Sequence, residues 1–240
     1  NESKDYIKMY QFHGVDIKSV DGKKEATATC PFCGRDNKFT VRVEDGRFQC
    51  FVCRLGSIRE GGNIHTFFNI LASESLGRTP DKQYEKLRES RKLLSIKTLK
   101  DWGVAKSFIT DDWILPAYNN EGKLNQLYKY VRDRERNKYI YYATAGLGHS
   151  IFGTQMYDKD KPIVYICEGP WDAMALYEVL RHTRVCKETD SYVYTDRTAE
   201  SLYTRANILA VPGCTTFLEK WAFLCHKKDV IILYDSDHPR

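Results

Sequence analysis

Two closely spaced cysteine pairs near the start of the chain constrain its fold more than any other feature. Cys30 and Cys33 form the first pair, and Cys50 and Cys53 form the second. Each Cys-x-x-Cys turn can present two thiolates to one ion, and two such turns complete a tetrahedral zinc site. Because four thiolates leave no coordination position open for water, we expect a structural zinc that replaces part of the core of a small ribbon.

The remaining cysteines do not share this spacing. They are Cys167, Cys186, Cys214 and Cys225, which we interpret as ordinary buried thiols. Paired spacing in an otherwise ordinary chain favours a metal over disulfides and indicates a reducing compartment. A redox role or chance spacing is the alternative for the two pairs. No apolar run approaches the roughly 20 residues of a membrane span, so we expect a cytoplasmic protein with no membrane partner.

Short strands are expected around the cysteines and again in the middle of the chain. The first group lies at 26–29, 39–43 and 47–49, and the second at 113–118 and 124–131. Between the groups, Gly61 and Gly62 interrupt the chain and a helix follows. Its buried stripe has helical spacing and consists of Ile64, Phe67, Phe68 and Leu71.

Apolar runs and helical patterns alternate in the second half of the chain. We expect strands at 163–167, 208–212 and 230–234, and helices at 172–180 and 216–225. This alternation predicts a parallel sheet with crossover helices.

Acidic residues follow two of those strands directly. Glu168 comes after the first, and Asp235 and Asp237 end another, two positions apart and so on one face. Functional groups gather at the carboxyl ends of parallel strands, where three carboxylates would repel one another unless a cation joined them. Oxygen ligands suit Mg²⁺, so we expect a magnesium site, with scattered surface acids as the alternative. Asp172 lies near the start of the next helix, where it could join this cluster or could be a cap or first-turn acid that complements the helix dipole.

Positive charge is unevenly distributed. The net charge is +5, and basic residues outnumber acidic ones between 82 and 100. Such a tract is compatible with phosphate binding or with a solvated helix face. A second basic set alternates with other residues and could share one face of a strand. It comprises Arg132, Arg134, Arg136 and Lys138.

Three of these motifs together resemble one family. Glu168-Gly169 and Asp235-x-Asp237 after strands resemble the TOPRIM domain of bacterial-type primases, topoisomerases and some nucleases. The cysteine ribbon followed by Gly61-Gly-Asn-Ile64 resembles the zinc-binding domain of the same primases. The basic segment 128–139, with Ile151-Phe-Gly153 after it, resembles their RNA polymerase subdomain. The likeness covers roughly 25–240 and is greatest to phage-type primase–helicases, because cellular primases usually have His where this chain has Cys33.

The resemblance implies an α/β fold in four parts. These are a zinc ribbon at 1–72 of small antiparallel strands, a linker at 73–98, a basic polymerase subdomain at 99–160, and a TOPRIM subdomain at 161–240 with a mainly parallel sheet and flanking helices. The segment 181–207 is longer and more polar than the family's usual connection. The chain stops three residues after Asp237, before a further acidic position of the family, so we expect a fragment that a helicase follows.

The implied activity is synthesis of short RNA primers on single-stranded DNA from ribonucleoside triphosphates. Asp235 and Asp237 would hold Mg²⁺ or Mn²⁺, and Glu168 would bind metal or assist proton transfer. Triphosphate or template contacts would come from Lys129, Arg132, Arg134, Arg136 and Lys138. The ribbon would read the template through Arg47, and through Phe48 and Phe51 unless these pack the ribbon. A replicative helicase, fused or separate, is the implied partner.

Three alternatives remain open. One is a recombination mediator that joins a zinc site to a TOPRIM fold without polymerase activity. Another is a fragment of a TOPRIM nuclease or topoisomerase. The third is an organellar helicase with an inert primase half. The Asp235 and Asp237 pair and the basic segment count against the mediator.

Overall fold

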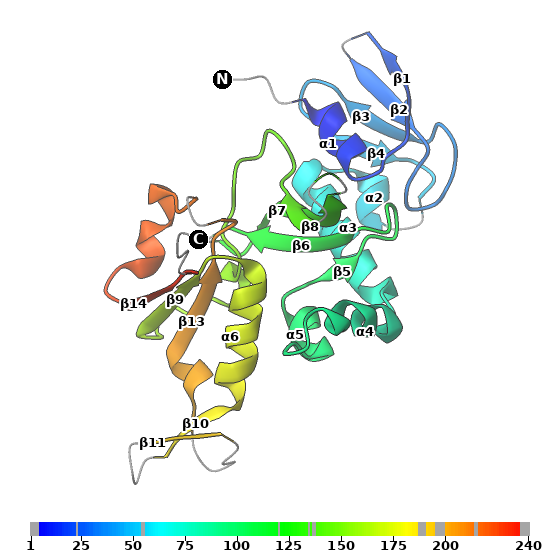
Figure 1. The fold of residues 1–240 in the computed structure, drawn as a ribbon. Helices are drawn as coiled ribbons and strands as arrows, with labels where there is room; N and C mark the ends of the chain where they lie inside the picture. Colours follow the sequence, from blue (N-terminus) through cyan, green and yellow to red (C-terminus); the bar gives the residue numbers. More distant parts are fainter. Residues whose placement is uncertain are drawn as a thin grey trace. The chain divides into compact units, whose positions relative to one another are not determined.

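The computed structural model describes residues 5–22, 24–53, 56–119, 121–133, 135, 138–186, 191–194, 200–213 and 216–235. The chain divides into two compact units, whose elements are labelled in Figure 1. The first unit comprises Asn1–Thr79, Ala105–Leu115 and Leu124–Gly148, and the second comprises Pro80–Val104, Pro116–Lys123 and His149–Arg240.

The first unit begins with an antiparallel sheet between helices. In chain order its elements are α1 (Tyr6–Phe12), β1 (Ile17–Asp21), β2 (Glu25–Ala28), β3 (Phe39–Arg42), β4 (Phe48–Cys50), α2 (Gly56–Glu60) and α3 (Ile64–Arg78). The sheet has the order β1-β2-β3-β4 and is antiparallel throughout. Asn63 caps α3 by accepting from the backbone nitrogens of His65 and Thr66, which explains why the helix starts after the two glycines.

Aromatic side chains fill the core of this sheet. The Tyr10 ring lies edge-on to Phe67, with centroids 4.9 Å apart, and Phe39 stacks on Phe48 at 5.3 Å. All four are buried, and the Tyr10 hydroxyl donates to the Gly46 carbonyl at 2.8 Å. The ribbon therefore has an apolar core of its own, built with α1 and α3, in addition to its cysteines.

A second sheet follows, with the order β5-β6-β7-β8. Its strands are β5 (Ala105–Lys106), β6 (Trp113–Tyr118), β7 (Leu124–Asp133) and β8 (Lys138–Tyr142). β7 and β8 form an antiparallel hairpin in which Arg132 pairs with Tyr139 and Asp133 with Lys138. Both predicted strands of this region, at 113–118 and 124–131, are present.

The tract at 73–98, expected to be a linker, is largely helical. Its start belongs to α3, and it also contains α4 (Asp81–Glu89) and the beginning of α5 (Ile96–Asp101). Tyr84 and Leu87 of α4 are buried, and the Tyr84 hydroxyl donates to the Val104 carbonyl at 2.8 Å. The polar composition that suggested a linker belongs to the exposed face of a short amphipathic helix.

The centre of the second unit is the predicted parallel sheet. Its strands are β9 (Ile163–Cys167), β13 (Ala206–Ala210) and β14 (Asp229–Leu233), in the order β13-β9-β14 with both pairs parallel. α6 (Pro170–His182) packs against β9 and β13, as Figure 1 shows. Trp221 and Leu224 of the 3₁₀ helix η3 (Glu219–Cys225) join Val164 and Ile166 in one buried cluster. The expected helix at 216–225 is thus a 3₁₀ helix, and the expected strand at 208–212 starts two residues earlier.

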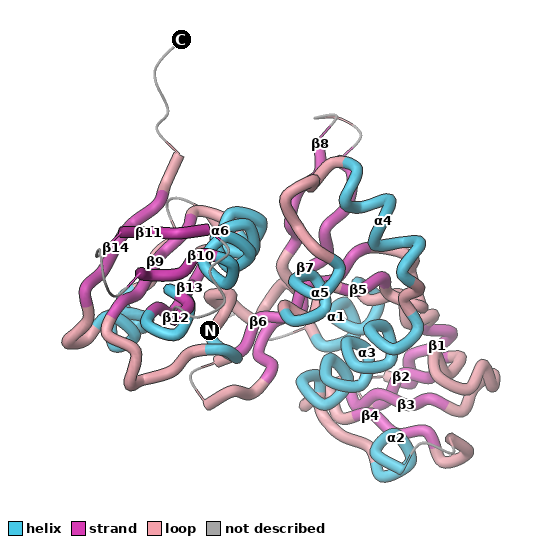
Figure 2. Tube along the Cα trace, turned by 90° about the horizontal axis from the view of Figure 1, so that it is seen from below, coloured by secondary structure: helices cyan, strands magenta, loops and turns pink. Residues whose placement is uncertain are grey.

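The long segment at 181–207 contains a small sheet of its own. β10 (Thr183–Cys186) pairs antiparallel with both β11 (Ser191–Tyr194) and β12 (Glu200–Ser201), and η2 (Leu202–Arg205) leads into β13. A further 3₁₀ turn, η1 (Thr154–Met156), precedes β9. Helices and strands are distinguished by colour in Figure 2. Among the described helices, none has the length and apolar character that a membrane span requires.

Candidate active site and metal centre

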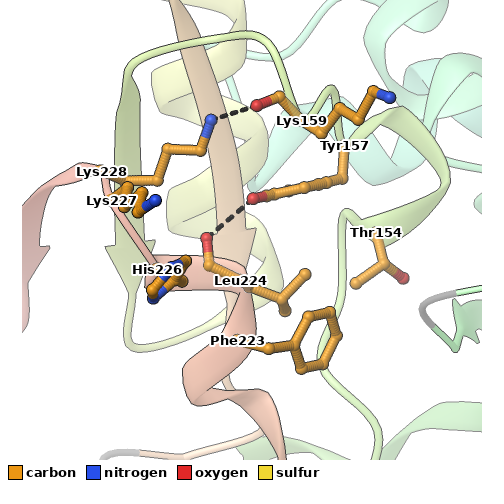
Figure 3. A pocket seen from close by; sticks show the side chains of 8 residues that line it. All are labelled: Thr154, Tyr157, Lys159, Phe223, Leu224, His226, Lys227 and Lys228. Carbon is orange, nitrogen blue, oxygen red and sulfur yellow. Dashed lines mark hydrogen bonds between the residues drawn. The ribbon is translucent and has the colours of Figure 1, made fainter.

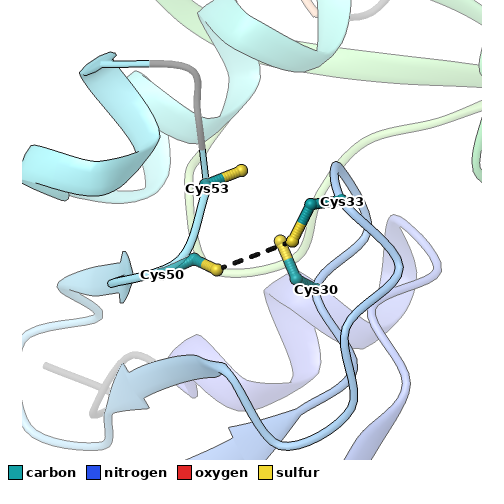
Figure 4. Close-up of side chains that lie close together, drawn as sticks. All are labelled: Cys30, Cys33, Cys50 and Cys53. Atoms are coloured by element: carbon teal, nitrogen blue, oxygen red, sulfur yellow. Dashed lines mark hydrogen bonds between the residues drawn. The ribbon is translucent and has the colours of Figure 1, made fainter.

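The four predicted cysteines converge in the first unit. Cys30 and Cys33 lie in the turn after β2, and Cys50 and Cys53 lie at the end of β4 and just beyond it, as Figure 4 shows. Their sulfur atoms all lie within 4.8 Å of one another, and the Cys33 and Cys50 sulfurs are 3.9 Å apart. Thiolates bound tetrahedrally to one ion at about 2.3 Å lie about 4 Å apart, so this arrangement is close to that of a zinc ribbon.

The environment of the sulfurs favours a bound cation. Cys30, Cys50 and Cys53 are buried, and burial raises the pKa of the Cys30 and Cys53 thiols. Deprotonated sulfurs so close together need a positive charge among them. The donor set is soft and closed, which matches structural zinc and leaves no open position for catalysis.

Two of the predicted acids meet in the second unit, at the carboxyl ends of neighbouring strands. Cys167 at the end of β9 pairs with Leu233 at the end of β14. Beyond that pair, the backbone nitrogen of Glu168 donates to the Leu233 carbonyl at 3.3 Å. The backbone nitrogen of Asp235 in turn donates to Glu168 Oε2 at 3.1 Å. Parallel register therefore brings residues 168 and 235 together, although they are far apart in the sequence.

Asp172, for which a first-turn role and a role in the acidic cluster were both open, lies in the same acidic environment. It does lie in the first turn of α6. Partial burial, together with the charges of Asp235 and Glu168, raises the pKa of its carboxyl, and the charge of Arg91 acts in the opposite direction. Raised carboxyl pKa values are typical of acids held near other acids without a cation. The sequence feature that could have indicated this role is the position of Asp172, four residues after Glu168.

Folding also brings a basic side chain that the sequence did not single out, that of Arg91, next to the start of α6. The guanidinium carbon of Arg91 is 5.1 Å from the centroid of the Trp171 ring. Arg91 lies between α4 and α5, in the basic tract that was expected to bind phosphate or to be solvated. Its position beside an acid and an aromatic ring makes it a candidate contact for a bound polyphosphate.

Asp237 lies outside the described residues, so the expected convergence of three carboxylates remains a prediction. In the part of the chain that the structure describes, the four cysteines are the only compact group of three or more metal-ligating residues. The donor oxygens of Glu168, Asp172 and Asp235 are thus not gathered as tightly as the cysteine sulfurs. They nevertheless suit a hard cation that keeps several waters.

The basic residues differ from the expectation of one shared strand face. Arg132 lies near the end of β7 and Lys138 starts β8, so the two occupy opposite strands of a hairpin. Arg134 and Arg136 lie outside the described residues. Lys129 is largely buried, since its ammonium lies 2.5 Å from Asp112 Oδ2 and donates to the Phe12 carbonyl at 3.1 Å. These internal contacts weigh against a nucleic-acid contact by Lys129.

The ribbon presents some of its expected template contacts and buries another. Phe48 is in the core, whereas the Phe51 side chain is 65% exposed. Arg47 is also exposed, with its Nε 3.6 Å from Asp45 Oδ2. Of the three, Arg47 and Phe51 remain candidate contacts.

Comparison with solved structures identifies the fold. The E. coli primase catalytic core superposes with a TM-score of 0.50 at 14% sequence identity, covering 73% of this chain and 63% of that chain. The fold is that of the primase catalytic core. The zinc-binding and RNA polymerase domains of the Aquifex aeolicus primase match with a TM-score of 0.48 at 15% identity, covering 97% of this chain and 70% of that chain. No family model matches the sequence, and no curated protein does.

The chain spans about two thirds of the length of these two primase structures, 63% and 70%. At this level of identity the primase likeness concerns the fold. It agrees with the expected class, an α/β chain with an antiparallel zinc ribbon and a parallel three-stranded sheet.

Proposed function

We propose that this chain is a DNA primase, which synthesises short RNA primers on single-stranded DNA from ribonucleoside triphosphates. The observation that carries the proposal is the meeting of Glu168 and Asp235 at the carboxyl edge of a parallel sheet, with Asp172 close by. The likeness of the fold to a primase catalytic core supports it. A zinc ribbon in the same chain supports a role in template selection.

In this proposal the acids would hold a divalent cation. Asp235 and Asp237 would be its main ligands, and bound Mg²⁺ or Mn²⁺ would supply charge neutralisation and orientation to the attack on the α-phosphate. Glu168 would bind the ion or accept a proton from the attacking hydroxyl. Arg91, close to Asp172, would contact the phosphates of the incoming nucleotide.

In the same proposal, the ribbon and the β7–β8 hairpin contact the template, and a helicase is the partner. Arg47 and Phe51 of the ribbon would contact unpaired bases, since aromatic and basic side chains together suit single strands. Arg132, Arg134, Arg136 and Lys138 would contact template or triphosphate around the β7–β8 hairpin. A replicative helicase, fused or separate, would be the partner, and the site of action would be the cytoplasm, that of the host if the chain is phage-encoded.

The direct test is incorporation of labelled ribonucleotides on single-stranded DNA templates with Mg²⁺. Short RNA is expected from the parent chain and none from Asp235→Asn. The matched control is Asp229→Asn, at the opposite end of the same strand, which should keep full activity. If the parent binds DNA but yields no RNA on any template, the primase proposal fails and a DNA-binding mediator becomes the better hypothesis.

A further inference from the structure

A pocket lies at the amino-terminal edge of the parallel sheet in the second unit. Its volume is about 560 Å³, within the range of small-ligand sites. The lining residues come from the loop before β9 and from the end of η3 and the turn before β14, as Figure 3 shows. Those used below are Tyr157, Lys159, Phe223, His226, Lys227 and Lys228.

This pocket is separate from the candidate active site. Lys159 precedes β9 and Lys228 precedes β14, whereas Glu168 and Asp235 follow the same two strands. A strand of five residues spans roughly 17 Å at about 3.3 Å per residue. The two sites therefore occupy opposite edges of one sheet.

Hydrogen bonds hold the pocket walls in place. The Tyr157 hydroxyl donates to the Leu224 carbonyl at 2.9 Å. The Lys228 ammonium donates to the carbonyls of Lys159 and Lys161, the latter at 2.6 Å, as Figure 3 shows for Lys159. Lys228 thus ties the two loops together, and its charge is engaged by the protein itself.

Other polar groups of the pocket are available for a ligand. In the described part of the chain, the side chains of Lys159, Lys227 and His226 have no hydrogen-bond or ion-pair partner. None of the residues that line the pocket is acidic. The nearby Asp158 carboxylate accepts from the backbone nitrogen of Asp160 at 2.8 Å, within its own loop.

The apolar part of the lining is aromatic and partly open. Phe223 is 49% exposed, although most large apolar side chains of η3 are buried. An exposed aromatic ring in the same pocket as unpaired lysines suits a ligand that has both a base and a phosphate. A ligand that consisted of an anion alone would make no stacking contact with the Phe223 ring.

We propose that this pocket binds a nucleotide unit, with its phosphate at Lys227 or Lys159, whose side chains lie on opposite sides of Tyr157 in Figure 3, and its base against Phe223. The unit is either a free nucleotide or one residue of a single-stranded nucleic acid. The inference does not depend on primer synthesis, because none of its residues belongs to the acidic site.

Photocrosslinking locates the ligand directly. The whole chain is irradiated with a short single-stranded oligonucleotide containing 5-iodouridine, without added divalent cation, and crosslinked peptides are mapped by mass spectrometry. We expect crosslinks at Tyr157, Phe223 or His226. The Lys159→Gln/Lys227→Gln double variant should lower their yield at least fivefold, and Phe223→Leu should lower it too. The matched control is Lys82→Gln/Lys86→Gln on the exposed face of α4, which should not change the yield.

Competition experiments then distinguish a free nucleotide from a single-stranded nucleic acid as the ligand, and show which results overturn the proposal. Displacement by uridine monophosphate indicates a free-nucleotide site, whereas displacement only by unlabelled oligonucleotide indicates a strand-binding site. Displacement by inorganic phosphate as effective as that by uridine monophosphate contradicts a base contact and overturns the proposal, as does an absence of crosslinks in this pocket. The Glu168→Gln variant should crosslink like the parent, so a failure of the primase proposal is recognised separately.

Discussion

The backbone nitrogen of Asp235 donates a hydrogen bond to the Glu168 side chain over 3.1 Å, which joins the ends of two parallel strands through a candidate catalytic carboxylate. The same oxygen atom is therefore part of the fold and part of the proposed chemistry. Replacements at Glu168 that keep the acceptor can separate the two roles.

Glu168→Gln keeps an oxygen that accepts from Asp235 and removes the negative charge. We expect primer synthesis to fall by about 100-fold or more, because a group that binds a cation or moves a proton is lost. The midpoint of thermal unfolding should change little. Parallel measurement of ribonucleotide incorporation and unfolding checks this, and an active Glu168→Gln chain would remove Glu168 from the mechanism.

Cys30→Ser should remove tightly bound zinc and destabilise the ribbon. The parent should hold about one zinc per chain by elemental analysis, and the variant much less, because a buried hydroxyl is a poor substitute for a thiolate. Hydrogen exchange should accelerate in β2 to β4 and remain slow in β9 and β13, which belong to the other unit. Cys225→Ser, far from the cluster in sequence and only partly buried, is the control. Iron, or no metal, in the parent would contradict a zinc ribbon.

Glu178 should contribute to stability in a pH-dependent way. Burial alone would raise its pKa, but hydrogen bonds from Thr98 and Ser95 outweigh this and lower the pKa to about 2. A carboxyl whose folded pKa is depressed stabilises the fold above its unfolded pKa, near 4.5, and loses that contribution as the pH falls towards 2. Its contacts join the start of α5 to α6.

Glu178→Gln keeps an acceptor oxygen but removes the charge that strengthens the hydrogen bonds from Ser95 and Thr98, so it should destabilise the second unit by about 2 kcal/mol at pH 7. The loss relative to the parent should shrink between pH 4.5 and 2. Denaturant unfolding at several pH values measures this. Glu85→Gln, on the exposed face of α4, is the control for removing a surface carboxylate. A difference that stays constant down to pH 2 would contradict the depressed pKa.

Short-range patterns in the sequence were enough to predict the main elements of the fold. The strand at 163–167 and the cysteine pairs depend on apolar runs and on spacing, which local sequence displays. The meeting of Glu168 with Asp235 could also be anticipated, because parallel strands place their carboxyl ends together. The cysteine cluster was accordingly expected in the correct segments, whereas the acidic metal site stays a prediction.

Features that depend on tertiary approach could not be predicted in this way. Arg91 looked like one more charge in a basic tract, and only folding brings it to Trp171 and Asp172. Likewise, the alternation of Arg132 and Lys138 suggested one strand, whereas a hairpin turn separates them. Composition alone cannot distinguish a polar linker from the exposed face of a helix, and this explains the helices found at 73–98.

Those helices change the expected response to proteases. A linker at 73–95 would be cut readily to release two stable pieces, but trypsin sites within a helix are accessible only after local unfolding. We expect slow cleavage within α4 and α5 despite their basic residues, and any early cutting at Arg91 or Lys92, in the short segment between the two helices. Tyr84→Phe removes the hydrogen bond to the Val104 carbonyl and leaves the ring, so it should speed cleavage modestly. Tyr84→Ala also empties a buried site, should cost about 3–5 kcal/mol, and should speed cleavage strongly.

The control is Leu93→Ala, at a side chain that is 72% exposed, which should behave like the parent. Time courses of limited trypsin digestion rank the four chains, and rapid cutting of the parent inside α4 or α5 would support the linker interpretation.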